Sequence, residues 1–539
     1  MEERTVTRPR RNVAAAQLAL VVGLCIALCG HCDSSLAAAG QAQPPNILFI
    51  VADDLGWNDV GWHGSEIHTP NLDALAMSGV RLDHSYVQPI CSPTRSSIMS
   101  GKFVSHTGIQ SLILSPKPCG LPTNITTIAQ QLKQRGYATH AVGKWHQGYC
   151  KPAYTPSHRG FDTFFGYYSG AEEYFSHYRK DHAGKLTWNA LDFHFDTPEN
   201  YTNVRNMNGT YSANAFTDQA IKVMDEHDKT KPLYIYLPFQ SVHSPMEVPP
   251  QYPAKYPKIN DQNRKTFAGM VSALDEAVGN VTSAWKRNGL YNNSVIVFTT
   301  DNGGLVRSGG NNYPLRGQKF TLWEGGTRGV AFVSGPLLNK TGYIYPGLVH
   351  AVDWYPTLVE LAGGDVSSLD VDGYPMWSHF SNNQTSPRTR FPYIIHNETQ
   401  TFVIRVGNWK LMLGVKNTSQ GGWFPPPGTP SVDSSVEQLR EHSINHLHPE
   451  EGDYKYDQEQ YSDAVQGKPK PELLYLFNLE DDPTEHTDLS QSNPQQVSVM
   501  MGHLKEMLQP YAPDLCIHVK GSPKSDPINF DNAYSTGWC

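Results

Sequence analysis

Cys91 begins a short segment whose residue types could carry out nucleophilic chemistry on an anionic group. Pro93 and Arg95 follow it at fixed offsets, and the segment continues to Lys102. Pro93 suits the first turn of a helix, because the N–H that proline lacks has no intrahelical partner there. Cys91 would then precede a helix N-terminus, which favours anions, and Arg95 adds a permanent positive charge. The alternative for such a cysteine is a small packed side chain.

A pair of adjacent carboxylates follows a continuous apolar run. Residues 46–52 are typical of a strand buried on both faces, and Asp53 and Asp54 come directly after it. Neighbouring carboxylates repel each other, so burying them requires a cation. Their hard oxygens suit calcium or magnesium. The alternative is a solvated turn with a helix cap.

A second pair of oxygen ligands follows another strand. Asp301 and Asn302 come directly after a strand predicted at 294–300 and precede two glycines. Glycine lets neighbouring backbone approach closely. If the two strands are parallel neighbours, both pairs of side chains lie at the same sheet edge.

Lysine and histidine side chains follow further predicted strands. Lys144 and His146 come after a strand predicted at 137–142, His243 lies in a His-x-Pro setting, and Lys319 follows an Arg-Gly-Gln triplet. Considered alone, each would be interpreted as a polar residue in a surface loop.

The elements that position these residues alternate between buried strands and helices along residues 44–386. This pattern predicts an α/β domain with a large, mainly parallel mixed sheet flanked by helices and a site at the carboxyl edge of its strands. The strands are predicted at 46–52, 137–142, 232–237 and 294–300, and the helices at 70–76, after Cys91, and at 128–135, 267–286 and 353–361.

Residues 387–539 predict a smaller α+β domain with an antiparallel sheet. Residues 402–413 are typical of two short strands joined by a Gly-Asn turn. A further strand is predicted at 473–477, a helix at 494–508, and a long polar loop at 431–471.

The composition excludes some classes of function and indicates a secreted protein. The chain has 539 residues, and its net charge of -8 indicates no general affinity for nucleic acid or anionic membranes. Residues 1–40 combine arginines, an apolar run and small residues, which is typical of a secretory signal peptide. A single membrane anchor is the alternative. We expect no stable membrane insertion once this segment is cleaved.

Eight cysteines are present, and three of them lie in the predicted signal peptide. With Cys91 as a nucleophile, four remain, which in a secreted chain suggests two disulfides. Sequence proximity favours the pairs Cys119–Cys150 and Cys516–Cys539, although three pairings are possible. Nine glycosylation sequons also fit the secretory pathway: they begin at Asn124, Asn200, Asn208, Asn280, Asn292, Asn339, Asn383, Asn397 and Asn417.

The segment after Cys91 resembles the sulfatase signature Cys-x-Pro-x-Arg, and the other motifs resemble that family too. Across nearly the whole chain after the leader, the resemblance is closest to the arylsulfatase B group, the N-acetylgalactosamine-4-sulfatases. The stretches that carry it are 55–61, 269–272, 275–282, 309–312 and 422–427, whereas 52–56 and 143–146 resemble motifs of the sulfatase family in general. The resemblance implies an alkaline-phosphatase-like fold and sulfate-ester hydrolysis.

The resemblance also implies roles for the site residues. Cys91 would be oxidised to formylglycine by the formylglycine-generating enzyme, and the hydrated aldehyde would be the nucleophile. The implied ligands of one Ca²⁺ ion are Asp53, Asp54, Asp301, Asn302 and the converted Cys91. The implied sulfate-binding residues are Lys144, His243 and Lys319. Arg95 would hold the hydrate, His146 would accept its proton, and His243 or Lys319 would protonate the leaving alcohol.

The expected substrate is a sulfated glycan or an aryl sulfate, and the expected location is the lysosome or the extracellular space. Two other functions stay open: a phosphodiesterase or phosphonate hydrolase of the same superfamily, and a secreted glycan-binding pseudo-sulfatase. Residues 174–208 differ from the arylsulfatase B group. Residues 161–228 are rich in Tyr, Phe, His and Asn. Two interpretations stay open for them: a loop-rich cover over a pocket that binds sugar by aromatic stacking, and simple packing.

Overall fold

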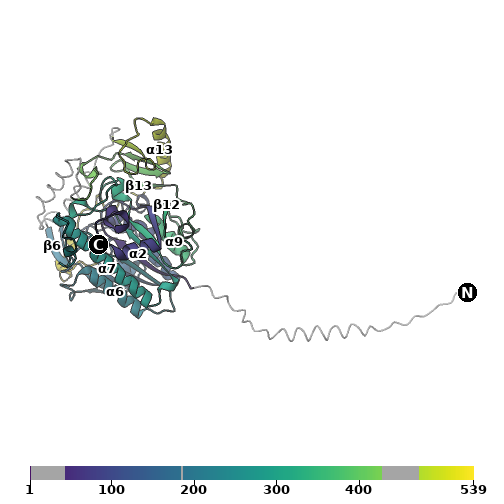
Figure 1. The fold of residues 1–539 in the computed structure, drawn as a ribbon. Helices are drawn as coiled ribbons and strands as arrows, with labels where there is room; N and C mark the ends of the chain where they lie inside the picture. Colours follow the sequence, from purple (N-terminus) through teal and green to yellow (C-terminus); the bar gives the residue numbers. More distant parts are fainter. Residues whose placement is uncertain (2–42, 184–185, 428–472) are drawn as a thin grey trace. The chain divides into compact units, whose positions relative to one another are not determined.

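The computed structural model describes Met1 and residues 43–183, 186–427 and 473–539. The chain divides into two compact units, Met1–Pro44 and Pro45–Cys539, and the second contains every described element (Figure 1). The predicted signal peptide, apart from Met1, and the predicted loop at 431–471 lie outside the described residues. No described helix is long and apolar enough to cross a membrane.

A ten-stranded mixed sheet forms the centre of the large unit. Its strand order is β12-β2-β11-β10-β1-β9-β3-β4-β7-β8, and the five strands from β10 to β4 are parallel neighbours. The bounds are β1 Asn46–Ala52, β2 Val80–Tyr86, β3 Ala138–Lys144, β4 Thr163–Tyr167, β7 His194–Thr197, β8 Asn200–Asn203, β9 Leu233–Pro238, β10 Ser294–Thr300, β11 Ala331–Ser334 and β12 Tyr343–His350. The predicted α/β class with a mainly parallel mixed sheet is confirmed.

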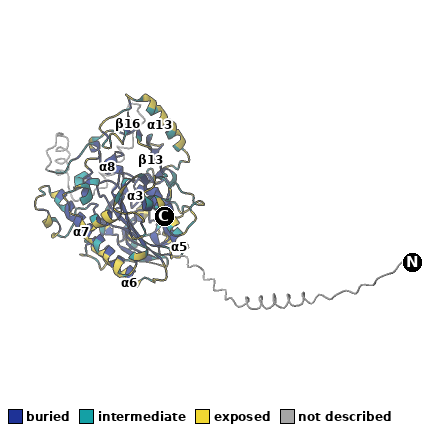
Figure 2. Cartoon of the chain, turned by 45° about the vertical axis from the view of Figure 1, so that its right-hand side comes forward, coloured by how far each residue is buried: buried dark blue, intermediate teal, exposed yellow. Residues whose placement is uncertain are grey.

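Helices cover both faces of this sheet because the strand residues alternate between two apolar clusters. On β1, Leu48 and Ile50 pack with helices α2, α6 and α7, whereas Phe49 and Val51 pack with α3, α5 and α9. The bounds are α2 Pro70–Ser78, α3 Cys91–Ser100, α4 Val104–Thr107, α5 Ile128–Gln134, α6 Ser212–Glu226, α7 Gln262–Arg287, α8 Glu324–Thr327, α9 Trp354–Leu361 and α10 Trp377–Asn382. Figure 2 shows exposed residues along the outer side of α6, as expected for an amphipathic helix.

A four-stranded antiparallel sheet lies in the C-terminal part, as predicted. Its strands are β13 Arg390–His396, β14 Thr401–Val406, β15 Trp409–Leu413 and β16 Leu474–Asn478, and α13 Pro494–Met507 packs on it through Met500 and Leu504. Both sheets lie within one compact unit, so a domain boundary between residues 386 and 387 stays a prediction.

The segment after α13 returns to α4 and to β6 (Leu186–Leu191), a strand of a separate two-stranded sheet. The Ala512 N–H donates to the Ser105 carbonyl, and Ala533 forms a bridge with Leu191 of β6. Residues 161–228 are more regular than the predicted loop-rich cover, since they hold β4, β7, β8, α6 and the hairpin of β5 Tyr178–Ala183 with β6 Leu186–Leu191.

The predicted disulfide pairings are wrong. The structure pairs Cys119 with Cys516 and Cys150 with Cys539, and neither Cys119–Cys150 nor Cys516–Cys539 forms. The returning C-terminal tail brings each of its cysteines to a loop of the large sheet, with Cα–Cα distances of 5.8 and 5.4 Å. Proximity in the sequence failed as a criterion because the C-terminal tail meets the loops that hold Cys119 and Cys150 only in the folded protein.

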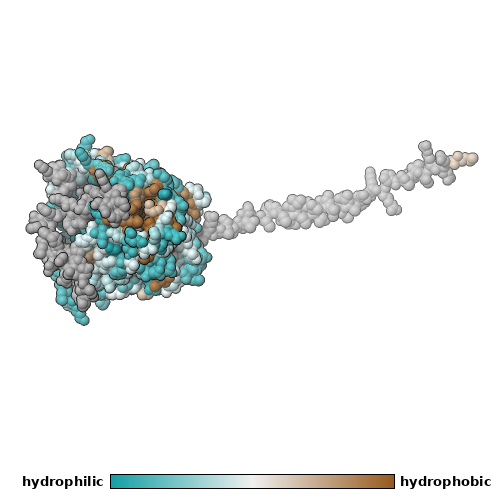
Figure 3. All heavy atoms as spheres, turned by 90° about the horizontal axis from the view of Figure 1, so that it is seen from above, coloured by the Kyte–Doolittle hydropathy of each residue, from teal (hydrophilic) through white to brown (hydrophobic). Residues whose placement is uncertain are grey.

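The surface suits glycosylation at the predicted positions, since all nine sequon asparagines are exposed. Figure 3 shows a mostly hydrophilic face of the molecule, with one larger group of hydrophobic residues. Exposure meets the steric requirement for glycan attachment, and use of each sequon stays a prediction.

Candidate active site

The two pairs of oxygen ligands meet at the carboxyl edge of the sheet because β1 and β10 are parallel neighbours. Ala52 is in register with Thr300, so Asp53-Asp54 and Asp301-Asn302 leave the sheet side by side. The Asn302 side-chain amide donates to Asp54 Oδ1 at 2.6 Å, and the Asp54 N–H donates to Asp301 Oδ1 at 3.3 Å. All four residues are buried.

Cys91 and Arg95 reach this edge from one face of helix α3, four residues apart. The sequence predicts that Cys91 precedes the helix, but the helix begins one position earlier: Cys91 is its first residue and Ile90 is the cap residue. The Arg95 guanidinium donates to Asp301 Oδ2 from Nε at 3.0 Å and from Nη2 at 2.8 Å, and to the Lys144 carbonyl at 3.2 Å. Arg95 therefore links helix α3 to the carboxyl ends of β10 and β3.

The end of β3 supplies Lys144 and His146. The Lys144 ammonium forms an ion pair with Asp53 Oδ2 at 2.5 Å. The backbone of His146 is left-handed, with φ of 54°, and this turns the imidazole toward the nucleophile position. Its Nδ1 lies 3.2 Å from Cys91 Sγ, and its Nε2 lies 3.0 Å from the Ile113 carbonyl.

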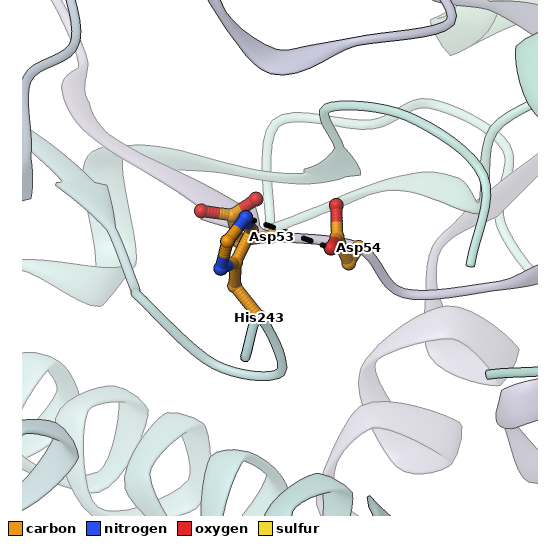
Figure 4. A group of neighbouring side chains, drawn as sticks. All are labelled: Asp53, Asp54 and His243. Atoms are coloured by element: carbon orange, nitrogen blue, oxygen red, sulfur yellow. Dashed lines mark ion pairs between the residues drawn. The ribbon is translucent and has the colours of Figure 1, made fainter. Parts of the chain in front are cut away.

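His243 and Lys319 complete the cluster from two loops. His243 Nε2 lies 3.8 Å from Asp54 Oδ2, and Lys319 Nζ lies 2.9 Å from the same carboxylate. Figure 4 shows His243 rising from its loop toward the two aspartates at the end of β1. The structure thus brings all the site residues predicted from the sequence into one buried cluster.

The donor set fits a hard cation. Asp53 Oδ1 and Asn302 Oδ1 are buried without a hydrogen-bond partner among the described residues, as expected of atoms that face an ion. Burial and repulsion from Asp53 raise the pKa of Asp301 to about 6, a cost that a cation would relieve. The Cys91 thiol is a soft ligand, so its predicted contact with calcium needs the oxygen of the converted residue.

Burial sets the charge of the remaining groups. The pKa of His146 is well below its usual value because of burial and the charges of Lys144 and Arg95. Burial, with the charge of Lys319, lowers the pKa of His243 to about 3. Both imidazoles are therefore neutral and able to accept a proton. Burial also raises the pKa of the Cys91 thiol, so the unmodified cysteine is a poor nucleophile.

Sequence reasoning missed the residues that hold the His243 loop. The Tyr174 hydroxyl donates to the His243 carbonyl at 2.7 Å, and the Gln240 side chain donates to the Glu172 carbonyl. The Tyr174 N–H in turn donates to Glu247 Oε2 at 2.7 Å. No local pattern marks these contacts, which join residues far apart in the sequence.

Comparison with known proteins gives consistent matches over most of the chain. The Sulfatase family model matches residues 45–364. Arylsulfatase J from Mus musculus is 39% identical over 509 residues, which cover 91% of this chain and 79% of that protein. N-acetylgalactosamine-6-sulfatase from Mus musculus is 28% identical over 383 residues, which cover 66% of this chain and 70% of that protein.

The fold is also shared with a solved structure. The crystal structure of Ps i-CgsB in complex with k-i-k-neocarrahexaose matches with a TM-score of 0.70 and 29% identity, over 88% of this chain and 95% of that chain. The similarity extends beyond the residues matched by the family model and includes most of the C-terminal part.

Proposed function

Since this chain belongs to the sulfatase family and is a sulfate ester hydrolase, we propose that it removes sulfate from N-acetylgalactosamine in glycosaminoglycans or related sulfated glycans. The observation that carries the reaction type is the buried cluster in which Cys91, Lys144, His243 and Lys319 surround the aspartates of β1 and β10. The substrate class is supported by the similarity to an N-acetylgalactosamine-6-sulfatase and to a structure that holds an oligosaccharide.

Conversion of Cys91 to formylglycine supplies the nucleophile in this proposal. A hydrated aldehyde offers one hydroxyl that can attack sulfur and a second whose deprotonation expels sulfate, which an unmodified residue cannot do. Arg95 and His146 flank the position of that group, and His146, which is neutral, accepts the proton released there. The maturation partner is therefore a formylglycine-generating enzyme.

Asp53, Asp54, Asp301 and Asn302 would hold one Ca²⁺ ion together with the converted Cys91. When bound, the ion supplies Lewis-acid polarisation and lowers the pKa of a hydroxyl group. Without it, three carboxylates share one buried edge, and Lys144 and Lys319 are paired with two of them. With the carboxylates bound to the ion, both ammonium groups would be available to bind sulfate oxygens.

Hydrolysis breaks the bond between sulfur and the ester oxygen, and the departing alcohol must receive a proton. Lys319 and His243 both lie against the Asp54 carboxylate. The Lys319 ammonium carries a proton that it can deliver, whereas His243 could deliver one only after the imidazole has first been protonated, which its lowered pKa disfavours. The lysine charges, and hydrogen bonds from His243, would stabilise the charge that develops on the sulfate oxygens.

We propose a lysosomal or secreted location. The exposed sequon asparagines and the disulfides joining the tail to the large sheet support passage through the secretory pathway.

Mass spectrometry of the peptide containing Cys91 tests the nucleophile. Protein from a host with the modifying enzyme should lose the sulfur and carry an aldehyde that a hydrazine reagent traps, while a Cys91→Ala variant carries none. An unmodified thiol in that protein would contradict the mechanism and favour a glycan-binding pseudo-sulfatase. A panel of sulfated and phosphorylated sugars then tests the substrate, since preference for a phosphodiester would favour the alternative hydrolase.

A further inference from the structure

A buried ionic cluster links the smaller sheet to the segment that carries Lys319. It consists of Glu324 at the start of α8, Lys410 on β15 and Glu485 in the turn after β16, and none of the three is exposed to solvent. Lys410 Nζ lies 3.0 Å from Glu324 Oε1 and 2.7 Å from Glu485 Oε1. The Glu324 N–H donates to Glu485 Oε2 at 2.7 Å.

The remaining hydrogen-bonding capacity of Glu324 is used by two tyrosines. The Tyr86 hydroxyl donates to Oε2 at 2.8 Å, and the Tyr393 hydroxyl donates to Oε1 at 2.9 Å. Buried ion pairs are costly to desolvate, and apolar replacements are often at least as stable. A fully satisfied cluster of this kind is therefore better explained by the geometry that it imposes than by stability.

The cluster fixes both ends of residues 316–327. The Gly325 N–H, next to Glu324, donates to the Arg316 carbonyl at 2.6 Å. The Arg316 side chain donates to the Glu485 carbonyl at 3.1 Å, and its guanidinium lies 3.5 Å from the ring centre of Trp323. Glu485 thus holds the segment at Glu324 through its side chain and at Arg316 through its backbone.

Lys319 lies between these two fixed ends. Its N–H donates to the Gly304 carbonyl at 3.2 Å, and the Gly303 N–H donates to the Gly326 carbonyl at 3.1 Å. A Cβ added at Gly303 would lie 1.9 Å from the Gly325 carbonyl oxygen, so the two segments are in direct backbone contact. The direction of the Lys319 side chain toward Asp54 therefore depends on where residues 316–327 are held.

We propose that Lys410 and Glu485 are positioning residues that set the place of Lys319 in the active site, acting through Glu324 and Arg316. The inference rests on the proposed role of Lys319 in binding the sulfate group. It assigns a task in catalysis to the smaller sheet, none of whose residues touches the reacting atoms.

A double-mutant cycle tests this assignment. Lys410→Met should lower kcat for an aryl sulfate by about 10- to 100-fold, as expected for a misplaced catalytic group. In a Lys319→Ala background the same change should cost less than about 3-fold, because the group that it positions is already gone. Lys133→Met, which breaks an exposed pair with Asp162, is the matched control and should leave kcat unchanged. Equal losses in both backgrounds would overturn the proposal.

Two further measurements apply if a variant does not fold or has no measurable activity. If Lys410→Met does not fold, Glu485→Gln keeps the side-chain shape and enters the same cycle, assayed above pH 7 so that the wild-type carboxylate is charged. If Lys319→Ala has no measurable turnover, calorimetry with inorganic sulfate replaces kcat as the readout. If mutating Lys410 weakens sulfate binding only when Lys319 is present, the positioning role is supported. If it weakens binding equally in both backgrounds, the positioning role is overturned.

A crystal structure of the Lys410→Met protein separates this inference from the proposed function. A shift of residues 316–320 with β1 and β10 unchanged supports positioning, whatever the substrate is. An unmoved Lys319 in that structure overturns it. Absence of sulfatase activity in the wild-type, formylglycine-containing protein would instead contradict the proposed function, independently of that shift.

Discussion

Nδ1 of His146 lies 3.2 Å from Sγ of Cys91, and the two residues come from different elements that meet only at the edge of the sheet. His146 follows β3, and Cys91 begins α3. The contact with the Ile113 carbonyl fixes the other ring nitrogen. The imidazole is therefore already oriented toward any oxygen nucleophile that replaces the sulfur.

Replacing His146 should slow turnover with little effect on substrate binding. We choose His146→Asn because asparagine tolerates the left-handed backbone at this position but cannot accept the proton. A decrease in kcat of about 10²- to 10⁴-fold is expected for loss of a general base, measured with an aryl sulfate. His518→Ala, at an exposed position, is the control. An unchanged kcat would remove His146 from the mechanism.

Calcium should stabilise the protein through the four oxygen ligands. After treatment with a chelator, adding Ca²⁺ to about 100 times its Kd should add about 2.7 kcal/mol of stability and raise Tm. Asp53→Asn should abolish this response, whereas Asp218→Asn, an exposed residue of α6, should keep it. The readout is thermal unfolding, so it needs no substrate. A calcium-induced shift that survives Asp53→Asn would place the ion elsewhere.

The disulfides should connect the C-terminal tail to the large sheet. Digestion without reduction should release one linked peptide pair containing Cys119 and Cys516 and another containing Cys150 and Cys539. Replacing Cys150 and Cys539 together by serine should lower the stability by about 2–5 kcal/mol, measured by unfolding. Recovery of a peptide pair joining Cys119 to Cys150 would contradict the structure.

Glu485 should make the stability fall as the pH rises from about 4.5 to about 7. Burial, together with repulsion from Glu324, raises the pKa of Glu485 to about 7 despite the charge of Lys410. Within this window the folded protein holds a proton that the unfolded chain has already lost, so unfolding becomes more favourable with increasing pH. Wild-type Tm should therefore decrease more between about pH 5 and pH 7 than the Tm of Glu485→Gln.

The carboxyl group of Glu324, which lies next to Glu485, titrates in a lower pH range. Burial would raise the pKa of Glu324, but the charges of Lys410, Arg405 and Arg328 outweigh it and lower the pKa to about 2. Its stabilising effect is present above the ordinary pKa of a glutamate and is lost only at lower pH. If the Tm of the wild type and the Tm of Glu485→Gln change equally between about pH 5 and pH 7, Glu485 does not titrate between these pH values.

The sequence by itself determined the central strands and the chemistry at their ends. Run 46–52 is apolar at every position after the first, and run 294–300 is apolar from Val295 to Phe298, because both faces of a central parallel strand are buried; the observed bounds of both strands match the prediction. The residues after these strands were identifiable because charged side chains next to a buried strand have few structural roles. The Gly-Asn turn likewise predicted the hairpin of β14 and β15 from local sequence alone.

Only the tertiary structure decided which distant segments meet. The disulfide partners are 397 and 389 residues apart, and the ionic cluster of Glu324, Lys410 and Glu485 joins three separate elements. Such contacts leave no periodicity or spacing in the sequence, because each residue's partner is set by the path of the whole chain. A buried lysine or glutamate looks like a surface residue until its partner is known, since burial itself is a property of the fold.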